Sequence, residues 1–183
     1  MDEQLLIEEC KQGNSWACKK LYELYAPTMM SVCVRYINDR DVARDVLQDG
    51  FIKVFTKINT YSNKGAFAGW MRRVFVTTAL EYLRTNRNLK QNVDILEVEQ
   101  ITDDMDFSAL DKLSADELLA CIATLPDGYR AVFNLFAIEG YSHCDIADML
   151  NIKEVTSRSQ FLRAKKALQK SVLTLISGKG ARK

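Results

Sequence analysis

The chain has 183 residues, of which 48% are hydrophobic, 27% are charged and only two are proline. A chain of this length and composition can bury one substantial core or two small ones, which excludes disorder over most of its length. The apolar runs are short and interrupted by charges, and the chain starts Met-Asp-Glu-Gln. We therefore expect neither membrane insertion nor a secretory signal, and we place the protein in the cytoplasm.

Charge is divided unevenly along the chain, although the formal net charge is only +1. Residues 94–118 carry nine acidic side chains against Lys112, and residues 153–183 carry nine basic side chains against Glu154. Opposed blocks of this kind suggest two basic lobes that face DNA, separated by an acidic connector, rather than one neutral globule.

Catalysis and metal binding have few candidate residues. The cysteines are odd in number and contain no Cys-x-x-Cys pair, so we expect reduced, mostly buried thiols rather than a disulfide framework or a zinc site. His143 is the only histidine, which leaves little for a metal cluster or a nucleophile–histidine arrangement. We expect no cofactor and no catalytic residue. The five cysteines are Cys10, Cys18, Cys33, Cys121 and Cys144.

Helical periodicity starts near Asp2 and pauses at Gly13, after which Ser15 offers a cap for a second helix. Within that second helical region, Pro27 is expected to start a new segment or to introduce a kink, because proline lacks the backbone N–H that a helix interior uses.

A third helix is predicted from about residue 40 to 58. Its polar face carries Asp45, Gln48 and Asp49 at positions i, i+3 and i+4, so the three side chains lie together. From the helix alone, this acidic patch is either an ordinary solvated surface or a binding surface.

A polar loop at residues 59–65, Asn-Thr-Tyr-Ser-Asn-Lys-Gly, precedes a fourth helix that opens at Ala66 or Phe67 and runs to about Asn86. This helix interleaves aromatic and basic side chains, which suits single-stranded nucleic acid because phosphates attract the charges and unpaired bases stack on rings. The alternative is that the aromatic residues belong to the core. The aromatic residues are Trp70, Phe75 and Tyr82, with the apolar Val74 beside them, and the basic residues are Arg72, Arg73, Arg84 and Arg87.

A second compact unit is predicted to start at Ser114, where Ser-Ala-Asp-Glu matches a capping box. We therefore expect an all-α protein with two helical domains joined by an acidic flexible linker. The expected boundaries are residues 1–93, 94–113 and 114–183. The helices expected in the second unit lie at about 115–124, 126–137, 142–150 and 154–176.

Residues 142–168 predict a helix-turn-helix. Ser142 and Asp145 form a capping-box-like start, and Asn151 can adopt the left-handed conformation that ends a helix. The second helix is expected to bury apolar residues at spacings of three and four and to turn a basic face outward. The expected buried set is Phe161, Ala164, Leu168, Val172 and Leu175, and the expected outward set is Ser157, Arg158, Gln160, Arg163, Lys166 and Lys170.

Short hydroxyls and amides near the start of that outward face can read base edges, while the arginines and lysines further along can meet phosphates. This arrangement is typical of a recognition helix in the DNA major groove. The alternative is an ordinary amphipathic helix with a solvated basic face.

Three runs of sequence together resemble bacterial sigma factors of the extracytoplasmic-function group, within the sigma-seventy family. Residues 39–55, DRDVARDVLQDGFIKVF, resemble a helix of the family's polymerase-binding region, and residues 67–84 resemble its next helix. Residues 125–168 align without a gap to the family's C-terminal domain. The resemblance covers nearly all of the chain and implies a promoter-specificity subunit in which catalysis belongs to the polymerase.

The resemblance also implies roles for individual residues. Asp45, Gln48 and Asp49 would face the clamp helices of the largest subunit of core RNA polymerase. The recognition helix would read the upstream promoter element as duplex DNA, and the N-terminal domain would capture bases of the melted downstream element, one of them flipped into the 59–65 loop. The upstream contacts implied are Lys153, Thr156, Ser157, Arg158, Gln160, Arg163 and Lys166. The downstream contacts implied are Asn59, Tyr61, Asn63, Lys64, Trp70, Arg73, Thr77 and Arg84.

Some positions depart from the family pattern. Val76 and Thr77 stand where Arg-Asn is usual, and Glu81 stands where Asp is usual, so specificity for the downstream element is expected to differ. The single Trp70 implies weaker melting than a pair of aromatic residues would give, and the alternative for it is a buried structural tryptophan. Departures in the recognition helix imply an altered base preference and one lost phosphate contact; they are Lys153, Val155, Ser157 and Gln160.

Two other classes of function compete with this interpretation. A transcription regulator of the response-regulator output type shares the helix-turn-helix and binds duplex DNA without polymerase, but it has no use for the acidic patch or for the 59–65 loop. An enzyme acting on nucleic acid would need clustered histidine, cysteine or carboxylate side chains. We further hypothesise an inhibitory partner, an anti-sigma factor, that covers the DNA-binding surfaces.

Overall fold

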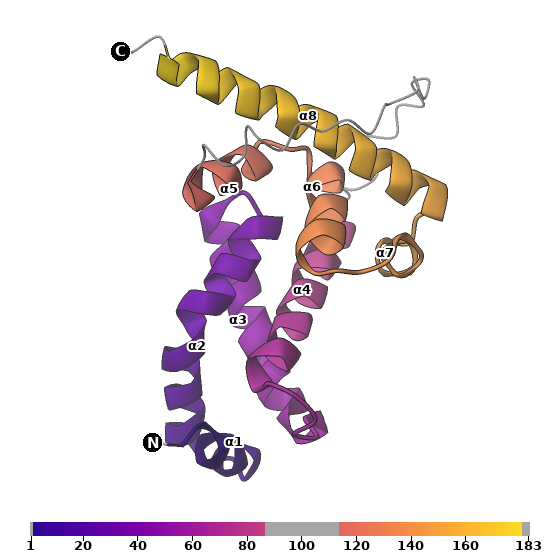
Figure 1. Cartoon of the computed structure of the whole chain (residues 1–183). Coiled ribbons are helices and arrows are strands. Elements are labelled where there is room, and N and C mark those ends of the chain that lie inside the picture. Colours follow the sequence, from indigo (N-terminus) through magenta and orange to yellow (C-terminus); the bar gives the residue numbers. More distant parts are fainter. Residues whose placement is uncertain (1, 87–113, 181–183) are drawn as a thin grey trace. The chain divides into compact units, whose positions relative to one another are not determined.

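A computed structural model describes residues 2–86 and 114–180, and these residues form helices and no β-strand. The chain divides into two compact units, Met1–Thr85 and Asn86–Lys183. Figure 1 draws unit 1 in indigo to magenta and unit 2 in orange to yellow. The prediction of an all-α protein with two helical domains is thus confirmed, while the predicted linker at 94–113 lies outside the described residues.

Unit 1 contains four α-helices and one short 3-10 helix among its described residues. They are α1 (Glu3–Lys11), α2 (Ser15–Tyr36), α3 (Arg40–Lys57), η1 (Ile58–Thr60) and α4 (Phe67–Thr85). Side chains of Asp2, Asn14 and Asp39 accept hydrogen bonds from backbone N–H groups at the starts of α1, α2 and α3. The cap of α2 is therefore Asn14, one residue before the Ser15 that the sequence predicted.

Of the two alternatives predicted for Pro27, a new segment or a kink, the new segment is wrong, because Pro27 lies inside α2. Helix α2 packs against α1, α3 and α4, and that tertiary contact holds the helix although Pro27 removes one of its backbone hydrogen bonds. The ring lies on the exposed side, so the lost bond is open to water.

The core of unit 1 is rich in large side chains. Tyr36, Phe67 and Phe75 are almost entirely shielded from solvent and come from α2 and α4. Ring contacts extend from this core, with the centroid of Tyr25 lying 5.7 Å from that of Phe67. This packing positions the start of α4, where the 59–65 loop ends.

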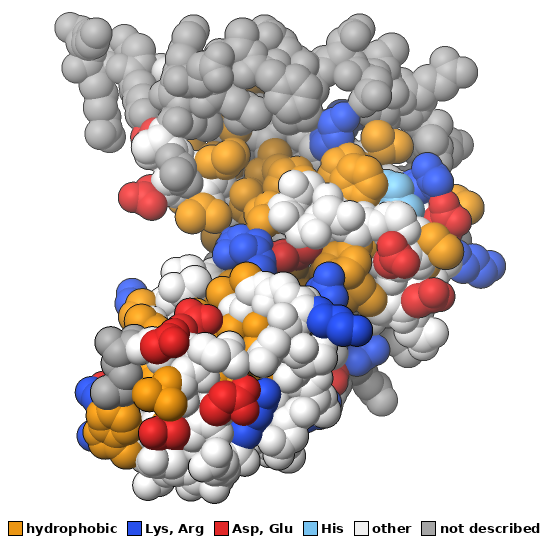
Figure 2. Space-filling view, turned by 60° about the horizontal axis from the view of Figure 1, so that its bottom comes forward, with side chains coloured by type: hydrophobic (Ala, Val, Ile, Leu, Met, Phe, Trp, Pro, Cys, Tyr) orange, Lys and Arg blue, Asp and Glu red, His pale blue; other side chains and the backbone are white. Residues whose placement is uncertain are grey.

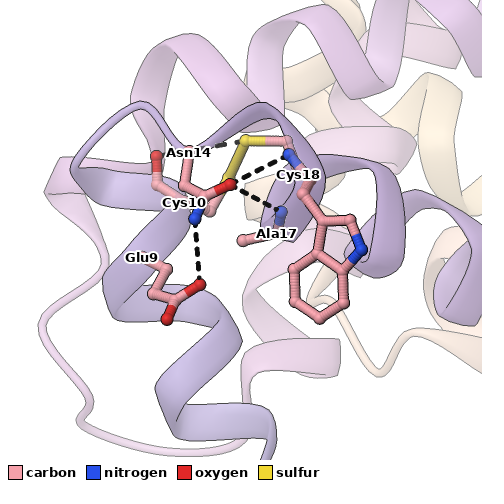
Figure 3. The surroundings of a disulfide bond; sticks show 6 residues. Glu9, Cys10, Asn14, Ala17 and Cys18 are labelled. Atoms are coloured by element: carbon pink, nitrogen blue, oxygen red, sulfur yellow. Dashed lines mark hydrogen bonds between the residues drawn. A yellow bond between two sulfur atoms is a disulfide. The ribbon is translucent and has the colours of Figure 1, made fainter.

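The expectation of reduced thiols is wrong for one pair, because Cys10 and Cys18 form a disulfide bond with their Cα atoms 5.1 Å apart (Figure 3). Gly13, with a φ of 83°, lies in the turn that folds α2 back beside α1, so the two cysteines meet across it. Cys33 and Cys121 are buried free thiols, as expected, and Cys144 is exposed.

Unit 2 contains the four predicted helices with altered bounds. They are α5 (Ala115–Ala123), α6 (Asp127–Phe133), which continues into the π-helical turn η3 (Asn134–Ile138), α7 (His143–Leu150) and α8 (Glu154–Gly180). Ser114 and Ser142 both form the capping boxes expected of them. Asn151 ends α7 in the left-handed conformation, with a φ of 53°.

Helix α8 carries much of the core of unit 2, because its apolar stripe packs on α5, α6 and α7. The buried cluster is Cys121, Ile122, Leu125, Ala164, Leu168 and Val172. A buried arginine, Arg130, makes polar contacts beside this core. Its Nη1 donates a 2.7 Å hydrogen bond to the carbonyl of Leu125, and its Nη2 forms an ion pair with Asp127. These contacts leave the opposite face of α8 open to solvent.

Candidate nucleic-acid and polymerase interfaces

The acidic patch of α3 lies on the surface of unit 1. Asp45, Gln48 and Asp49 are all exposed, as their helical spacing predicted. Ile52, on the next turn of the same face, is 63% exposed. A large apolar side chain in solvent beside carboxylates is suited to contact with another protein, because its burial there would remove apolar area from water.

The 59–65 loop is built around a buried ring. Tyr61 is only 8% exposed, and its ring centroid lies 5.0 Å from that of Phe67 and 5.7 Å from that of Trp70. Its hydroxyl donates a 2.6 Å hydrogen bond to the carbonyl of Gly65, which closes the loop. Tyr61 was predicted as a residue that receives a base, but its ring is not free for stacking and it instead holds the loop in shape.

The polar residues of the loop point outward. Asn59, Asn63 and Lys64 are exposed, and Asn63 has a φ of 59°, a left-handed conformation that asparagine tolerates better than most residues. Amide groups offer both donors and acceptors, so the exposed loop can match the edge of an unpaired base.

A cavity of about 240 Å³ lies between α3 and α4 in unit 1. The side chains of Trp70, Arg73 and Thr77, three predicted downstream contacts, line it together. The opposite wall carries Lys53 and Lys57 of α3. An indole beside three cationic side chains provides a surface for a base and charges for its phosphates.

The sequence missed Lys53 and Lys57, although a signal was present. They continue the i+4 spacing of Asp45 and Asp49 along α3, so a single stripe changes from acidic to basic halfway along the helix. Lys53 also forms an ion pair with Glu81, which lines the same cavity. Arg84, the last predicted downstream contact, is exposed in the final turn of α4.

Two of the predicted upstream readers face the core of unit 2. Ser157 is 0% exposed and Gln160 is 4% exposed, so neither can contact a base edge as the helix stands. The amide of Gln160 packs against Gly128 of α6. The physical reason is periodicity: position 157 lies four residues before Phe161 and seven before Ala164, on the stripe that α8 buries.

The hydroxyl of Ser157 meets the only histidine of the chain. Its Oγ lies 2.9 Å from Nδ1 of His143. This contact joins the first turn of α8 to the first turn of α7. The histidine ring stacks on Phe136 with centroids 4.4 Å apart. Burial, and secondarily the charge of Arg158, lowers the pKa of His143, which favours the neutral ring. Figure 2 shows this histidine in pale blue among charged and hydrophobic side chains.

The remaining predicted upstream residues face outward or lie at the edge of that face. Lys153, Arg158 and Lys166 are exposed, whereas Thr156 and Arg163 are half-buried. The Arg158 guanidinium pairs with Glu154 one turn earlier. Nη1 of Arg163 donates to the hydroxyl of Tyr129 at 3.4 Å. The exposed basic side chains of α8 include Arg158, Lys166 and Lys170, so its solvent-facing surface is basic.

Comparison with known families assigns both units. Residues 21–89 match the family described as Sigma-70 region 2, and residues 115–168 match Sigma-70, region 4. The chain is an extracytoplasmic-function sigma factor of the sigma-70 family. The α3–α4 surfaces lie in the first of these regions, and the helix-turn-helix lies in the second.

The relatives of this sigma factor match it from end to end. The ECF RNA polymerase sigma-E factor of Haemophilus influenzae is 27% identical over 190 residues, covering 96% of this chain and 98% of that protein. The protein of the same name from Escherichia coli K12 is 29% identical over 189 residues, covering 96% of this chain and 97% of that one. The chain is therefore an RNA polymerase sigma factor and acts in transcription initiation.

A solved structure supports the fold of this sigma factor. The sigma factor RpoE of Bartonella quintana, crystallised in complex with the anti-sigma factor NepR, aligns with a TM-score of 0.50 at 17% identity, covering 84% of this chain and 95% of that one. Among residues 2–86 and 114–180, no helix is both long enough and apolar enough to cross a membrane.

Proposed function

We propose that this sigma factor directs core polymerase to its promoters by reading the upstream element as duplex DNA and the downstream element as a melted single strand. One observation carries the proposal. Helix α3 presents Asp45 and Asp49 to solvent and, on its next turns, contributes Lys53 and Lys57 to a cavity with Trp70. A polymerase-binding surface and a single-strand site on one helix have no use in a regulator that binds duplex DNA alone.

Polymerase contact is assigned to Asp45, Gln48 and Asp49, which would face the clamp helices of the largest subunit. Downstream capture is assigned to the exposed loop and to the cavity, with Tyr61 as support. The downstream residues proposed are Asn59, Asn63, Lys64, Trp70, Arg73, Thr77 and Arg84. Upstream duplex contact is assigned to Lys153, Thr156, Arg158, Arg163 and Lys166, while Ser157 and Gln160 are withdrawn from it.

Purified chain added to core RNA polymerase on a promoter library tests this proposal. Position-specific transcription starts that require the chain are the expected result. Duplex binding in gel shifts with no dependence on polymerase would overturn it and favour the response-regulator type of function. In this role the chain works in the cytoplasm. It determines where the polymerase starts transcription and contributes no chemistry of its own.

An anti-sigma factor is proposed as a further partner, since the Bartonella relative in fold is crystallised with one. Such a partner would cover the surfaces assigned to DNA or to polymerase. Affinity purification of the tagged chain from its native cells, with and without core polymerase, tests this. A captured protein that displaces polymerase from the chain is the expected result, and recovery of polymerase alone would contradict it.

A further inference from the structure

Helix α1 braces the loop to which downstream capture is assigned. The Nζ of Lys11 lies 5.8 Å from the centroid of the Tyr61 ring, the buried ring around which the loop is built. The Lys11 side chain is only 17% exposed and its Nζ lies 3.1 Å from Oε1 of Glu8. A cation over a ring face in a half-buried site favours one position of that ring.

Glu8 holds Lys11 in position beside that ring. Its carboxylate pairs with the Lys11 ammonium three residues later on α1, and the hydrogen bond from Lys11 is the chief cause of the lowered pKa of Glu8. The contact from α1 to the loop therefore runs from Glu8 through Lys11 to the ring of Tyr61.

The disulfide fixes the end of α1 from which these two side chains extend. Cys10 lies between Glu8 and Lys11 along α1, and its bond to Cys18 ties that end to the first turns of α2. Figure 3 shows the bond beside the hydrogen bond, 3.1 Å long, that Nδ2 of Asn14 donates to Glu9. A helix of nine residues is marginal on its own, so its last turn depends on such ties.

We propose that the Cys10–Cys18 bond couples thiol redox state to the downstream single-strand site, with Glu8 and Lys11 as positioning residues between them. This inference rests on the proposed function. In the oxidised chain the end of α1 is fixed and the loop is held ready for a base. In the reduced chain the last turn of α1 frays more often, and the loop loses the support of Lys11 for part of the time.

The oxidant is a low-molecular-weight disulfide, and the chemistry is thiol–disulfide exchange. The thiolate of Cys18, the less buried of the two, attacks the small disulfide, forms a mixed disulfide and releases one small thiolate. The thiolate of Cys10 then attacks the sulfur of Cys18 and releases the second. Two electrons pass from the cysteine pair to the small disulfide, and the two cysteine protons end on the two released thiols.

The test uses the holoenzyme of full chain and core polymerase with a fluorescent single-stranded oligonucleotide that carries the downstream element found in the library experiment. Its affinity is measured in oxidised and in reduced glutathione buffers. If reduction leaves about a third of the molecules with a seated loop, the apparent Kd rises about threefold. Cys18→Ser should bind at the weak value in both buffers, while Cys144→Ser, at an exposed free thiol, should keep the response. Equal affinities of the unaltered holoenzyme in the two buffers would overturn the proposal.

Two further measurements test separately whether the redox coupling runs through α1 and whether the proposed single-strand binding occurs. The double variant Glu8→Ala/Lys11→Ala should bind weakly in both buffers, and a retained redox response would show that α1 is not the route. In a Trp16→Phe background, Trp70 emission should change on reduction without any DNA, because Trp70 lies against Tyr61. Failure of both redox forms to bind the oligonucleotide would contradict the proposed function, whereas an unchanged Trp70 emission would contradict the redox coupling alone.

Discussion

Gly50 of α3 lies directly against the ring of Phe75 of α4, so closely that a methyl group at position 50 would overlap the ring. Phe75 is 0% exposed and its ring also packs edge-on against Phe51, with centroids 5.1 Å apart. The ring therefore has no free space into which it could turn. The close approach of α3 to α4, the two helices that form the cavity, depends on the absence of a side chain at Gly50.

Replacement of Gly50 by alanine should lower the free energy of unfolding by about 1–3 kcal/mol, the usual range for overpacking a tight core. Thermal denaturation followed by circular dichroism measures the change. Gly69→Ala is the matched control, because Gly69 also lies in a helix but nothing lies within 4 Å of the added methyl. That control should be neutral or stabilising by up to about 1 kcal/mol. Equal stability of the two variants would contradict the packing argument.

Reversal of charge at Asp45 and Asp49 to lysine should abolish association with core polymerase and leave the fold intact, since both side chains are exposed. Surface substitutions of this kind usually change stability by less than about 0.5 kcal/mol. Co-purification with core polymerase measures the loss. Asp148→Lys, a reversal at an exposed site of α7, serves as the control and should retain association. Retained binding by the double variant would remove the role assigned to the acidic patch.

Ser157 and Arg158 should behave oppositely, although they are adjacent. Ser157→Ala removes the partner of His143 Nδ1 and should destabilise unit 2 by about 1 kcal/mol while preserving base preference. Arg158→Ala should leave stability nearly unchanged, weaken duplex binding and lower the salt slope of binding by about one. Thermal denaturation of the chain, and titration of duplex DNA with the holoenzyme over a range of salt concentrations, separate the two effects. A changed base preference in Ser157→Ala would return Ser157 to the reading surface.

The lowered pKa of His143 predicts a pH dependence of stability. The unfolded state takes up a proton as the pH falls through the ordinary value of 6.5, whereas the folded state resists until lower pH. Because the unfolded state then binds more protons, the free energy of unfolding falls as the pH drops below about 6.5. Denaturation of the full chain between pH 8 and pH 5 (about the range in which histidine titrates) measures this. His143→Gln should flatten that segment of the profile, and an unchanged profile would exclude His143 as its cause.

Glu154 should weaken DNA binding, because its carboxylate pairs with Arg158 and adds a negative charge to the basic face of α8. Glu154→Gln removes that charge and should tighten duplex binding at low salt by roughly two- to fivefold, with a smaller gain at high salt as charges are screened. Fluorescence anisotropy of a duplex probe, titrated with the holoenzyme of this chain and core polymerase, measures the change. Weaker binding by this variant would mean that the ion pair positions Arg158 rather than competing with the phosphates.

Periodicity and capping residues made most of the fold predictable. Ser142 and Asn151 bound α7 as the sequence indicates, because their side-chain and backbone preferences act locally. The prediction that Ser157 and Gln160 face outward is wrong because it rests on their polarity, whereas their spacing places position 157 on the buried stripe of α8. At Ser157 the packing of α8 on α7 outweighs the preference of a polar side chain for solvent. His143 of α7 supplies the hydrogen bond that the buried hydroxyl needs.

The disulfide and the cavity could not be predicted in the same way. Cys10 and Cys18 have no spacing signature, and they meet only because a turn folds one helix back on another. The cavity combines Trp70 of α4 with Lys53 and Lys57 of α3, and the pairing of two helices at a particular register depends on packing rather than on either helix alone.

The acidic patch and the basic wall of the cavity lie on one unbroken helix, so α3 fixes the distance and the angle between them. Asp49 and Lys53 are four positions apart, and a rise of about 1.5 Å per residue sets the two about 6 Å apart along the axis, with a rotation of only about 40° between them. A one-residue insertion between them would rotate one surface by about a further 100° relative to the other, so in the proposed function polymerase bound to one would no longer align with melted DNA at the other.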